Sequence, residues 1–428
     1  MDQRKYDYAI VGSGAGGATI AMELAKKGKS VLVAERGIRE EKVGSVRDAI
    51  RYYDFRGLTK APPKSKEGTI LWRTLMAGGS TVASCGNGVR CLEKELADFG
   101  INLDQEFSDL EEETVVTPYD ERRLSKGSKM ILEVSKDLGY KMEPMPKFID
   151  PKKCRRCGQC VAGCKYGAKW TALDFLDKAV ENGAEVLYKA MVEKVIIENG
   201  KAKGVSLRSN VGRTEIMSDA VILAAGGFGT PLILKNSGIE GAGTNFFMDL
   251  LVNTYGVAKG LSQTDEPTMA LVDHEFYESK GFILSPFIQQ SRITRLYDIG
   301  MKGMLMSTRG LLGIMTKTRD DPSGHIYPDG SFSKPVSDKD RERLNEGSKI
   351  SKEILIKAGV DKNSITVSKI QGAHPGGTSA IGKVVDKDLQ TKVDNLFVCD
   401  ASVLPTSPGM PPILTIAALA KRLGKILS

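Results

Sequence analysis

The first 35 residues constrain the fold more than any other part of the chain. Residues 8–11 form a short apolar run rich in β-branched side chains, which predicts a buried strand. A glycine-rich turn over 12–17 follows directly, then helical spacing over 18–27, then a second apolar run over 30–35 that ends in an acid. Strand, glycine turn, helix, strand and carboxylate in this order predict a βαβ unit and a doubly wound α/β fold.

The glycines of this unit and the acid that ends it each have a physical task. Gly12 permits the tight turn, Gly14 lets the backbone approach a pyrophosphate at the helix N-terminus, and Gly17 permits close helix packing. Glu35 is placed to accept hydrogen bonds from ribose hydroxyls. The unit therefore predicts a dinucleotide site. FAD and NAD use the same turn, and its place at the start of a long chain favours FAD.

Length and composition bound the rest. A chain of 428 residues with 41% hydrophobic and 27% charged residues predicts an ordinary globular protein with two domains or one enlarged domain. Lys and Arg exceed Asp and Glu by 61 − 53 = +8, with both signs spread along the chain. Nucleic acid is not an expected partner.

No segment is long and apolar enough to predict a membrane span, since the best runs, 220–228 and 413–420, are short. Residues 1–5 are polar and show no leader pattern. Four of the seven Cys fall within eleven residues, which favours a metal centre in a reducing compartment over a disulfide scaffold. We expect a cytoplasmic protein.

Three further segments carry a family resemblance. Residues 76–87 form a second glycine-rich loop, and 220–231 read as a buried strand that turns into a helix. His374-Pro-Gly-Gly-Thr378 precedes a block at 395–405 and an apolar helix over 413–427. In this order the segments resemble the glucose-methanol-choline (GMC) oxidoreductase family, most specifically in the C-terminal block.

The resemblance implies an FAD cofactor and assigns residues to it. Gly12, Gly14, Gly17 and Glu35 hold the dinucleotide, Gly78, Gly79 and Ser80 lie near its phosphates or flavin, Asp400 and Ala401 lie beside the ribityl chain and pyrophosphate, and the backbone of Val192 meets the adenine.

The resemblance also implies that His374 is the catalytic residue that faces the flavin and helps to remove the substrate hydroxyl proton. An imidazole suits this work because its ordinary pKa is near neutrality. Two departures weaken the interpretation as a simple alcohol oxidase, and the missing His or Asn, together with the iron–sulfur centre predicted below, favours a dehydrogenase or reductase. The segment 408–412 lacks the family's second His or Asn, and only about 120 residues are left for the substrate domain.

The predicted organisation has five segments. Residues 1–95 form the first part of the FAD-binding domain, 96–175 an insertion with the Cys cluster, 176–244 the second part, 245–367 a substrate or cap domain of α+β type, and 368–428 the C-terminal part of the FAD-binding domain.

Two finer expectations concern local structure. Residues 185–217 alternate polar and apolar side chains between turns and predict a three-stranded meander. The methionines at 301, 304, 306 and 315 are interpreted as core residues, with a flexible apolar substrate pocket as the alternative.

The Cys cluster has the spacing CxxCxxCxxxC, which is typical of a cubane iron–sulfur centre. Cys154, Cys157, Cys160 and Cys164 are the predicted ligands of a [4Fe-4S] cluster. No Pro follows Cys164, so Cys85 or Cys91 is an alternative fourth ligand. Structural zinc and unmetallated thiols are the alternative interpretations.

Cations surround these thiols at Lys152, Lys153, Arg155, Arg156, Lys165 and Lys169. They would stabilise an anionic cluster or form a docking surface for an acidic, ferredoxin-like electron carrier. An ordinary solvated face is the alternative.

The sequence therefore predicts an FAD-dependent oxidoreductase. A hydride passes between a carbon of a small-molecule substrate and flavin N5, and an iron–sulfur centre exchanges single electrons with the carrier. The alternatives are a cluster-free FAD alcohol dehydrogenase with structural Cys, and an electron-transfer flavoprotein or assembly subunit without a small-molecule substrate.

Overall fold

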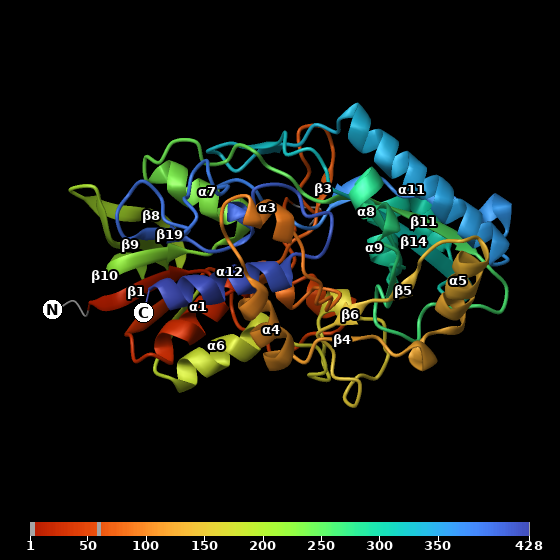
Figure 1. Ribbon diagram of the computed structural model, residues 1–428, viewed down its shortest axis with the longest axis horizontal. Coiled ribbons are helices and arrows are strands. Elements are labelled where there is room, and N and C mark those ends of the chain that lie inside the picture. Colours follow the sequence, from red (N-terminus) through yellow and green to blue (C-terminus); the bar gives the residue numbers. More distant parts are fainter. Residues whose placement is uncertain (1–4, 58–60, 428) are drawn as a thin grey trace.

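Two large sheets organise the molecule, one in each half (Figure 1). The computed structural model describes residues 5–57 and 61–427. Most of the segment 1–5, in which we expect no leader, lies outside these described residues.

The first sheet has the strand order β7-β2-β1-β10-β9-β8, with β19 beside β10. Its parallel part consists of β1 (Tyr6–Val11), β2 (Val31–Glu35), β7 (Glu185–Tyr188), the second half of β10 (Gly212–Leu223) and β19 (Leu396–Val398).

The strand β10 joins this parallel part to a meander. Its first half pairs antiparallel with β9 (Lys201–Ser209), which in turn pairs with β8 (Met191–Glu198). From Ser218 onward the same strand pairs parallel with β1. The predicted meander is confirmed for β8 to β10, while β7 belongs to the parallel sheet.

Helices cover both faces of the first sheet (Figure 1). On one face α1 (Ala15–Ala25) packs between α6 (Ala172–Glu181) and α12 (Ile413–Ile426), and α4 (Asp104–Glu113) lies on α12. On the other face α7 (Gly226–Asn236) packs against β8. Because apolar residues of β1, β2 and β10 are buried on both sides, this half forms the largest core of the chain. The doubly wound α/β prediction is confirmed.

The second sheet has the order β13-β14-β11-β18-β3, with β17 also on β11. Its strands are β13 (Phe282–Pro286), β14 (Leu311–Thr318), β11 (Leu250–Val257), β18 (Gln371–Gly372), β3 (Ile70–Leu71) and β17 (Thr366–Val367). Segments from the start, middle and end of the chain therefore meet in one sheet.

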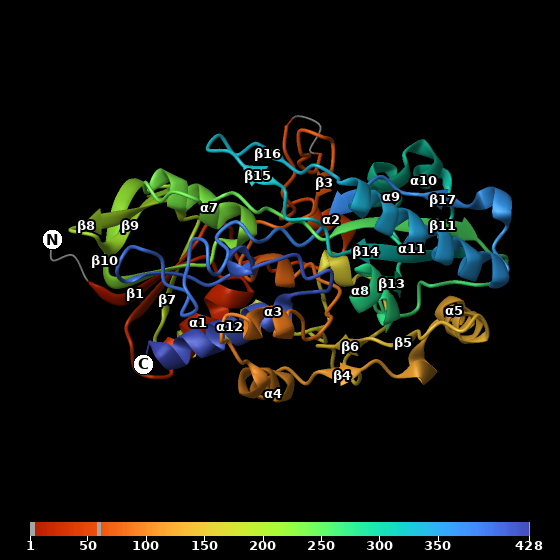
Figure 2. The ribbon, with the colours of Figure 1, turned by 45° about the horizontal axis from the view of Figure 1, so that its top comes forward.

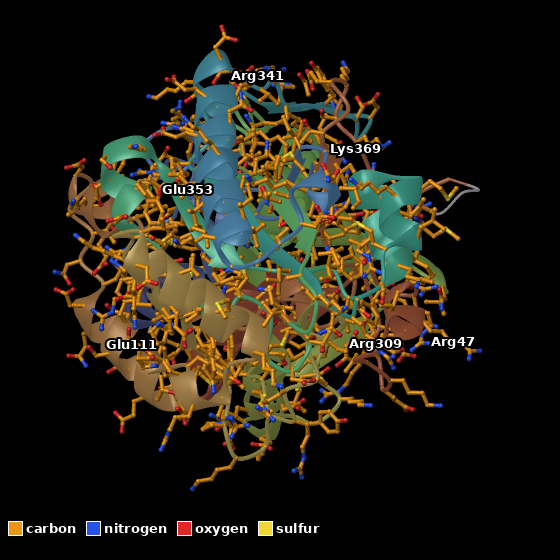
Figure 3. The ribbon with its side chains drawn as sticks, turned by 90° about the vertical axis from the view of Figure 1, so that its right-hand side faces the viewer. Arg47, Glu111, Arg309, Arg341, Glu353 and Lys369 are labelled. Atoms are coloured by element: carbon orange, nitrogen blue, oxygen red, sulfur yellow. The ribbon has the colours of Figure 1, made fainter. Side chains whose placement is uncertain are left out.

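The long helix α11 (Asp338–Lys357) covers one face of this sheet and begins at a capping box between Ser337 and Asp340. Figure 3 shows it side-on, with Arg341 and Glu353 on its outer surface. The helix α5 (Lys126–Asp137) packs beside it, and the Tyr140 hydroxyl donates to Glu353 at 3.0 Å.

Short elements complete the structure. They are the helices α2 (Val46–Ala49), α3 (Glu93–Ala97), α8 (Glu275–Lys280), α9 (Arg292–Ile299) and α10 (Met301–Leu305), the paired strands β4 (Thr117–Pro118) with β6 (Pro146–Lys147), β5 (Glu143–Pro144) with β12 (Leu271–Val272) and β15 (His325–Ile326) with β16 (Phe332–Ser333), and 3₁₀ turns at Gly79–Thr81, Glu121–Arg123, Cys160–Ala162, Lys362–Ser364 and Ala401–Val403.

The interpretation of the methionines as core residues is wrong for two of them. Met301 and Met304 lie on α10 and are exposed, because this short helix stands at the outer edge of the second half (Figure 2). Met315, on the central strand β14, is buried as expected. Among the described residues, none of the helices has the length and apolar character needed to cross a membrane.

Candidate active site

One large cavity of about 1300 Å³ runs from the glycine turn of the first sheet to the second sheet. Nine of the eleven cofactor and catalytic residues named from the sequence line it: Gly12, Gly14, Glu35, Gly79, Ser80, Val192, His374, Asp400 and Ala401. Gly17 and Gly78 support the wall from behind.

The glycine turn is packed so closely that side chains are excluded from most of it. At Gly17 a Cβ atom would lie 2.0 Å from the Gly12 carbonyl oxygen, and at Gly16 it would lie 1.8 Å from that of Cys399. At Gly14 a Cβ would meet nothing within 4 Å and would point into open space beside the cavity. Gly14 therefore leaves room for a ligand, whereas Gly16 and Gly17 bring α1 against the sheet.

Glu35 is held in place by the turn that it faces. Its carboxylate accepts hydrogen bonds from the Ser13 backbone at 3.0 Å, the Ser13 hydroxyl at 2.7 Å and the Gly37 backbone at 2.6 Å. Burial raises its pKa, against the effect of these bonds. The carboxylate thus lines the cavity in a fixed orientation, as a ribose partner requires.

The second glycine loop and the C-terminal block meet beside this turn. The Gly78 backbone donates to the Ser13 hydroxyl at 3.1 Å, and a Cβ at Gly79 would lie 3.1 Å from the Cα of Gly14. Asp400 accepts bonds from the backbone of Gly226 at 2.9 Å and from the Thr230 hydroxyl at 2.5 Å. Burial raises the pKa of Asp400. The predicted segments therefore converge on one wall.

His374 lies where the cavity reaches the second sheet. Its Nδ1 atom is 2.7 Å from Oδ2 of Asp249 and 2.8 Å from Nζ of Lys317. Asp249 and Lys317 are themselves 3.4 Å apart, with side-chain exposures of 0% and 2%, while His374 retains 24% toward the cavity. Burial and the Lys317 ammonium lower the pKa of His374, against the opposing effect of Asp249.

The segment 408–412, which lacks the expected His or Asn, contacts the same cluster through its backbone. The Gly409 backbone donates to Oδ1 of Asp249 at 3.0 Å, and the Ser407 hydroxyl donates to it at 2.6 Å. Pro411 and Pro412 line the cavity. This loop therefore orients Asp249 and presents only apolar rings to the cavity.

Four aromatic rings line the cavity on another side. Tyr53 stacks on Phe55 with centroids 5.8 Å apart, and Trp72 meets Tyr297 edge-on at 6.3 Å. Phe55 also stacks on Tyr297. Such a wall favours an apolar or aromatic ligand.

Comparison with known families agrees with this arrangement. Residues 7–251 match the N-terminal domain of GMC oxidoreductases, and residues 313–420 match the C-terminal domain of the same family. The chain belongs to the GMC oxidoreductase family. Membership supports FAD as the cofactor of the cavity, which the glycine turn, Gly14 and Glu35 fit.

Several relatives align along nearly the whole chain. An uncharacterized protein of Methanocaldococcus jannaschii is 30% identical over 97% of this chain and 98% of its own length. A long-chain-alcohol oxidase of Arabidopsis thaliana is 24% identical over 97% of this chain and 67% of its own.

Solved structures show the same fold. A formate oxidase of Aspergillus oryzae superimposes with a TM-score of 0.77 at 16% identity, covering 100% of this chain and 98% of its own. Pyridoxine 4-oxidase from Mesorbium loti gives 0.75 at 16% identity and 99% of both chains.

The Cys loop of this GMC oxidoreductase lies beside the same cavity. Gly158, Gln159, Val161 and Ala162 line the large cavity, and Tyr53 donates to the Val161 carbonyl at 2.7 Å. On the other side of the loop, Cys154, Cys157, Cys160 and Cys164 all line a second, small cavity of about 20 Å³. Gly158 borders both cavities.

All seven cysteines are free thiols. Within residues 5–57 and 61–427, no three His, Cys, Asp or Glu side chains are gathered into an ion-binding group. The four thiols of the loop thus share one cavity without converging on a common point. Cys91 lies elsewhere, with its sulfur 3.2 Å from the Thr415 hydroxyl, whereas Cys85 lines the large cavity.

One of the cations expected around the thiols is not at the surface. Lys169 is buried, and its Nζ donates to the carbonyls of Val82 at 2.8 Å, Ser84 at 2.6 Å and Cys160 at 2.9 Å. Its inclusion in a docking surface was wrong, because these three acceptors draw it inward. The other five cations are exposed.

The sequence did not reveal Asp249 or the role of Lys317. Asp249 stands at the start of β11 with φ of 49°, and no motif marks it. Lys317 had a signal, since it is an isolated cation in the otherwise uncharged strand Leu311–Thr318, all of which is buried. A Lys at such a position needs a buried partner.

Proposed function

We propose that this GMC oxidoreductase oxidises the CH–OH group of an apolar alcohol, or reduces the corresponding carbonyl, with His374 as its catalytic base. The observation that carries the proposal is the His374–Asp249 contact of 2.7 Å at the wall of the cavity that also contains the glycine turn. A base fixed at one nitrogen presents the other to a ligand.

FAD, when bound, supplies the ring that accepts or returns a hydride. The chain itself moves the proton. Asp249 accepts a hydrogen bond from Nδ1–H of His374, so the unprotonated Nε2 is free to take the proton of a substrate hydroxyl as the C–H bond breaks. The proline rings of 411 and 412 and the aromatic wall exclude water from this part of the cavity.

The aromatic wall supports an apolar substrate. Tyr53, Phe55, Trp72 and Tyr297 offer continuous ring surface, and two more apolar residues, Phe287 and Met315, line the cavity near β14. Relatives named long-chain-alcohol oxidases favour the same class. We propose a primary or secondary alcohol with an apolar body.

A series of alcohols tests the proposal. Hexanol, dodecanol, hexadecanol and benzyl alcohol are mixed anaerobically with the FAD-loaded protein, and bleaching of the flavin absorbance is followed. We expect bleaching by the longer or aromatic members, and a loss of about 10² to 10⁴-fold in rate in His374→Gln. His274→Gln is the control, because that ring is exposed and pairs with Glu143 at the surface. Bleaching at an unchanged rate in His374→Gln would remove the base assignment.

We further propose that the electrons leave through the Cys loop to an acidic, ferredoxin-like carrier. The enzyme would then be a dehydrogenase or reductase, and it would work in a reducing compartment such as the cytoplasm. A [4Fe-4S] cluster held by Cys154, Cys157, Cys160 and Cys164 would supply single-electron transfer there. Thiols are the donors that such a cluster takes, and four free thiols share one cavity that borders the large one at Gly158, so the residue types fit although the thiols do not converge on one point.

Electrostatics around the loop support an anionic group. Two buried ammonium groups lie beside it. Among the described residues, Lys169 donates to three carbonyls, and Lys147 donates to the carbonyls of Cys85 and Thr268 and the amide oxygen of Asn87, with the Glu266 carboxyl within electrostatic range of Lys147. Burial lowers the pKa of Lys147 to about 8. Buried cations are costly without a counter-charge, and thiolates or a cluster would provide one.

Exposed cations support the carrier. Lys152, Lys153, Arg155, Arg156 and Lys165 surround the exposed Cys157. Complementary charge of this kind speeds the encounter with an acidic protein.

Anaerobic purification with iron, sulfide, zinc and flavin analysis tests the cluster. About four irons per chain that fall in Cys157→Ser but not in Cys399→Ala support it. FAD with neither iron nor sulfide would leave a cluster-free alcohol dehydrogenase.

Plain oxidase activity is the second candidate, favoured by the names of the relatives and fold neighbours. Air is admitted to the alcohol-reduced enzyme, and hydrogen peroxide and flavin reoxidation are measured. Rapid peroxide formation would identify dioxygen as the acceptor and remove the carrier from the proposal.

A further inference from the structure

A buried ammonium lies beside the imidazole of His374. Lys317 projects from β14 and reaches both partners, with Nζ 2.8 Å from Nδ1 of His374 and 3.4 Å from Oδ2 of Asp249. Its side chain is 2% exposed and lines the large cavity. The segment 408–412, where the family commonly has a second His or Asn, provides no such side chain. Lys317 is a cation that contacts His374.

The charges around His374 come from several elements. Asp249 at the start of β11 and Lys317 on β14 touch it directly. Behind Asp249, the Ser407 hydroxyl bridges to Asp320, which pairs with Lys334 at 3.1 Å, so that second acid has its own cation. The thiols of Cys85 and Cys91 lie within electrostatic range of Lys317. The imidazole therefore faces one carboxylate and one ammonium at contact distance.

We propose that Lys317 is a positioning residue that keeps His374 in the neutral form with its proton on Nδ1. This inference rests on the proposed base role of His374. Nδ1 cannot donate to Asp249 and accept from Lys317 at once. With the proton on Nδ1, the charge-assisted bond to Asp249 forms, and the ammonium binds the same carboxylate.

The ammonium then opposes protonation of the ring. A carboxylate alone would favour the imidazolium, which carries no lone pair at Nε2 and cannot act as a base. Lys317 offsets this attraction, so the pair Asp249–Lys317 orients the ring without charging it. The direction of the pKa shift of His374, downward, agrees with this geometry.

Nuclear magnetic resonance of the FAD-loaded protein tests this without any substrate. The chain has three histidines, His274, His325 and His374, so ring carbon and nitrogen signals from labelled histidine can be assigned with one His→Gln variant each. We expect His374 to be neutral, with the Nδ1–H tautomer, and to titrate below its ordinary value of about 6.5. In Lys317→Gln its pKa should rise to or above that value, and in Lys317→Arg it should stay low.

The controls separate this role from a general effect of losing a buried cation. Lys421→Gln removes a buried ammonium that pairs with Glu23 and Glu113 far along α12, and it should leave the His374 titration unchanged. The proposal is overturned if wild-type His374 titrates above the ordinary value of about 6.5, carries the proton on Nε2, or keeps its pKa in Lys317→Gln. The titration of wild-type His374 still tests the proposal if Lys317→Gln does not fold. A failure of the alcohol assay would overturn the proposed function and leave this titration intact.

A second observation, independent of the first, concerns the surface over the cavity. The hairpin of α9 and α10, residues 292–305, stands at the outer edge of the molecule (Figure 2). Four large apolar side chains are exposed there: Ile293 at 51%, Met301 at 62%, Met304 at 45% and Leu305 at 75%. Scattered exposed apolar residues are normal, but a group of four on one hairpin marks an interaction surface.

The exposed charges of the hairpin are all positive. Arg292, Lys302 and Arg309 are exposed beside these side chains, and Asp298, the only acid in residues 291–310, is buried. The hairpin also forms part of the cavity wall, through Ile293, Thr294 and Tyr297. An apolar surface mixed with cations thus adjoins the aromatic wall of the cavity.

We infer that this hairpin inserts its apolar side chains into an anionic phospholipid surface. Short apolar projections flanked by cations are the combination that binds the boundary between headgroups and acyl chains. A stable protein partner would need a contact of about 1,200 Å² or more, which four side chains do not provide. Binding there would place the cavity wall next to a source of apolar substrate.

Vesicle flotation tests this surface. Wild-type protein should float with vesicles of phosphatidylcholine and phosphatidylglycerol and far less with phosphatidylcholine alone. Met304→Asp with Leu305→Asp should abolish flotation, while Val211→Asp, at a side chain that is 94% exposed on the meander, should not. The inference is overturned if the wild type does not float with the anionic vesicles at low salt, or if the double variant still floats. It is also overturned if light scattering shows that the protein dimerises through the hairpin.

Discussion

Oδ2 of Asp249 lies 2.7 Å from Nδ1 of His374, while Oδ1 of the same carboxylate accepts the Ser407 hydroxyl at 2.6 Å and the Gly409 backbone at 3.0 Å. One carboxylate thus contacts the His374 ring with one oxygen and the proline loop with the other. The ring and the loop that face the same cavity are therefore oriented together.

Replacement of Asp249 by Asn should lower the maximal rate of alcohol-dependent flavin reduction by about 10³-fold. The amide favours the wrong tautomer and leaves Lys317 without its counter-charge. Because Asp249 raises the pKa of His374, its loss should also move the acid limb of the pH–rate profile to lower pH. That direction is opposite to the one expected for Lys317→Gln.

Ser407→Ala is the matched control for Asp249→Asn. It removes one hydrogen bond to the same carboxylate but keeps the charge, which costs about 1 kcal/mol or less than tenfold in rate. Equal losses in the two variants would show that the loop, and not the charge of Asp249, carries the effect.

The glycine turn allows a prediction on two neighbouring residues. Gly14 has φ of −71°, and an added Cβ meets nothing within 4 Å, so Gly14→Ala should fold normally. Its methyl group would stand in the space next to the cavity and weaken FAD binding by about tenfold or more, as the close-approach role of this glycine requires.

Gly16→Ala should behave in the opposite way. A Cβ there would lie 1.8 Å from the Cys399 carbonyl oxygen, which belongs to the backbone and cannot move aside. We expect a loss of about 1–3 kcal/mol or more in the free energy of unfolding of the apoprotein. Thermal unfolding without FAD, followed by titration with FAD, separates the two effects. Normal stability in Gly16→Ala would contradict the packing argument.

The sequence was informative where a local pattern has a single structural solution. Gly12, Gly14, Glu35 and Asp400 all line one cavity, and the sequence could mark them because each belongs to a pattern with short-range geometry. The partners of His374 could not be predicted in this way. Asp249 and Lys317 lie 125 and 57 residues from it in sequence and meet it only because β11 and β14 pair in the second sheet.

Exposure was predicted poorly where side chains of one type have different neighbours. Met315 and Met304 are both in apolar stretches, yet one lies on a central strand and the other on a helix at the edge. Lys165 and Lys169 flank the same thiols, but only Lys169 finds three carbonyl oxygens that take it into the interior. Composition cannot distinguish these cases, since tertiary contacts decide them.

A buried carboxyl outside the active site gives a prediction on stability. Glu266 accepts the Ser125 backbone at 2.9 Å and the Ser128 hydroxyl at 2.5 Å at the start of α5, and burial raises its pKa from 4.5 to about 7. The native state therefore binds more protons than the unfolded state between these values. The stability contributed by this group is complete below pH 4.5 and declines as the pH rises toward 7.

Glu266→Gln should remove that decline, because an amide does not titrate. Relative to wild type, the variant should be more stable at neutral pH by up to ~3 kcal/mol, at about 1.36 kcal/mol per pKa unit, and the difference should shrink in acid. Urea unfolding across this pH range measures it. A constant difference at every pH would mean that Glu266 has its ordinary pKa.

The last prediction concerns the buried cation at the Cys loop. In Lys169→Met, the carbonyls of Val82, Ser84 and Cys160 lose their donor, which should cost about 1–3 kcal/mol of unfolding free energy. If the thiols hold an anionic cluster, the same change also removes its nearest buried counter-charge. Iron and sulfide content should then fall, and the reduction potential of any remaining cluster should become more negative.

Lys165→Met is the control, since it removes an exposed charge from the same loop and should change neither the stability nor the iron and sulfide content much. A loss of stability with no iron in either protein would assign Lys169 to structure alone.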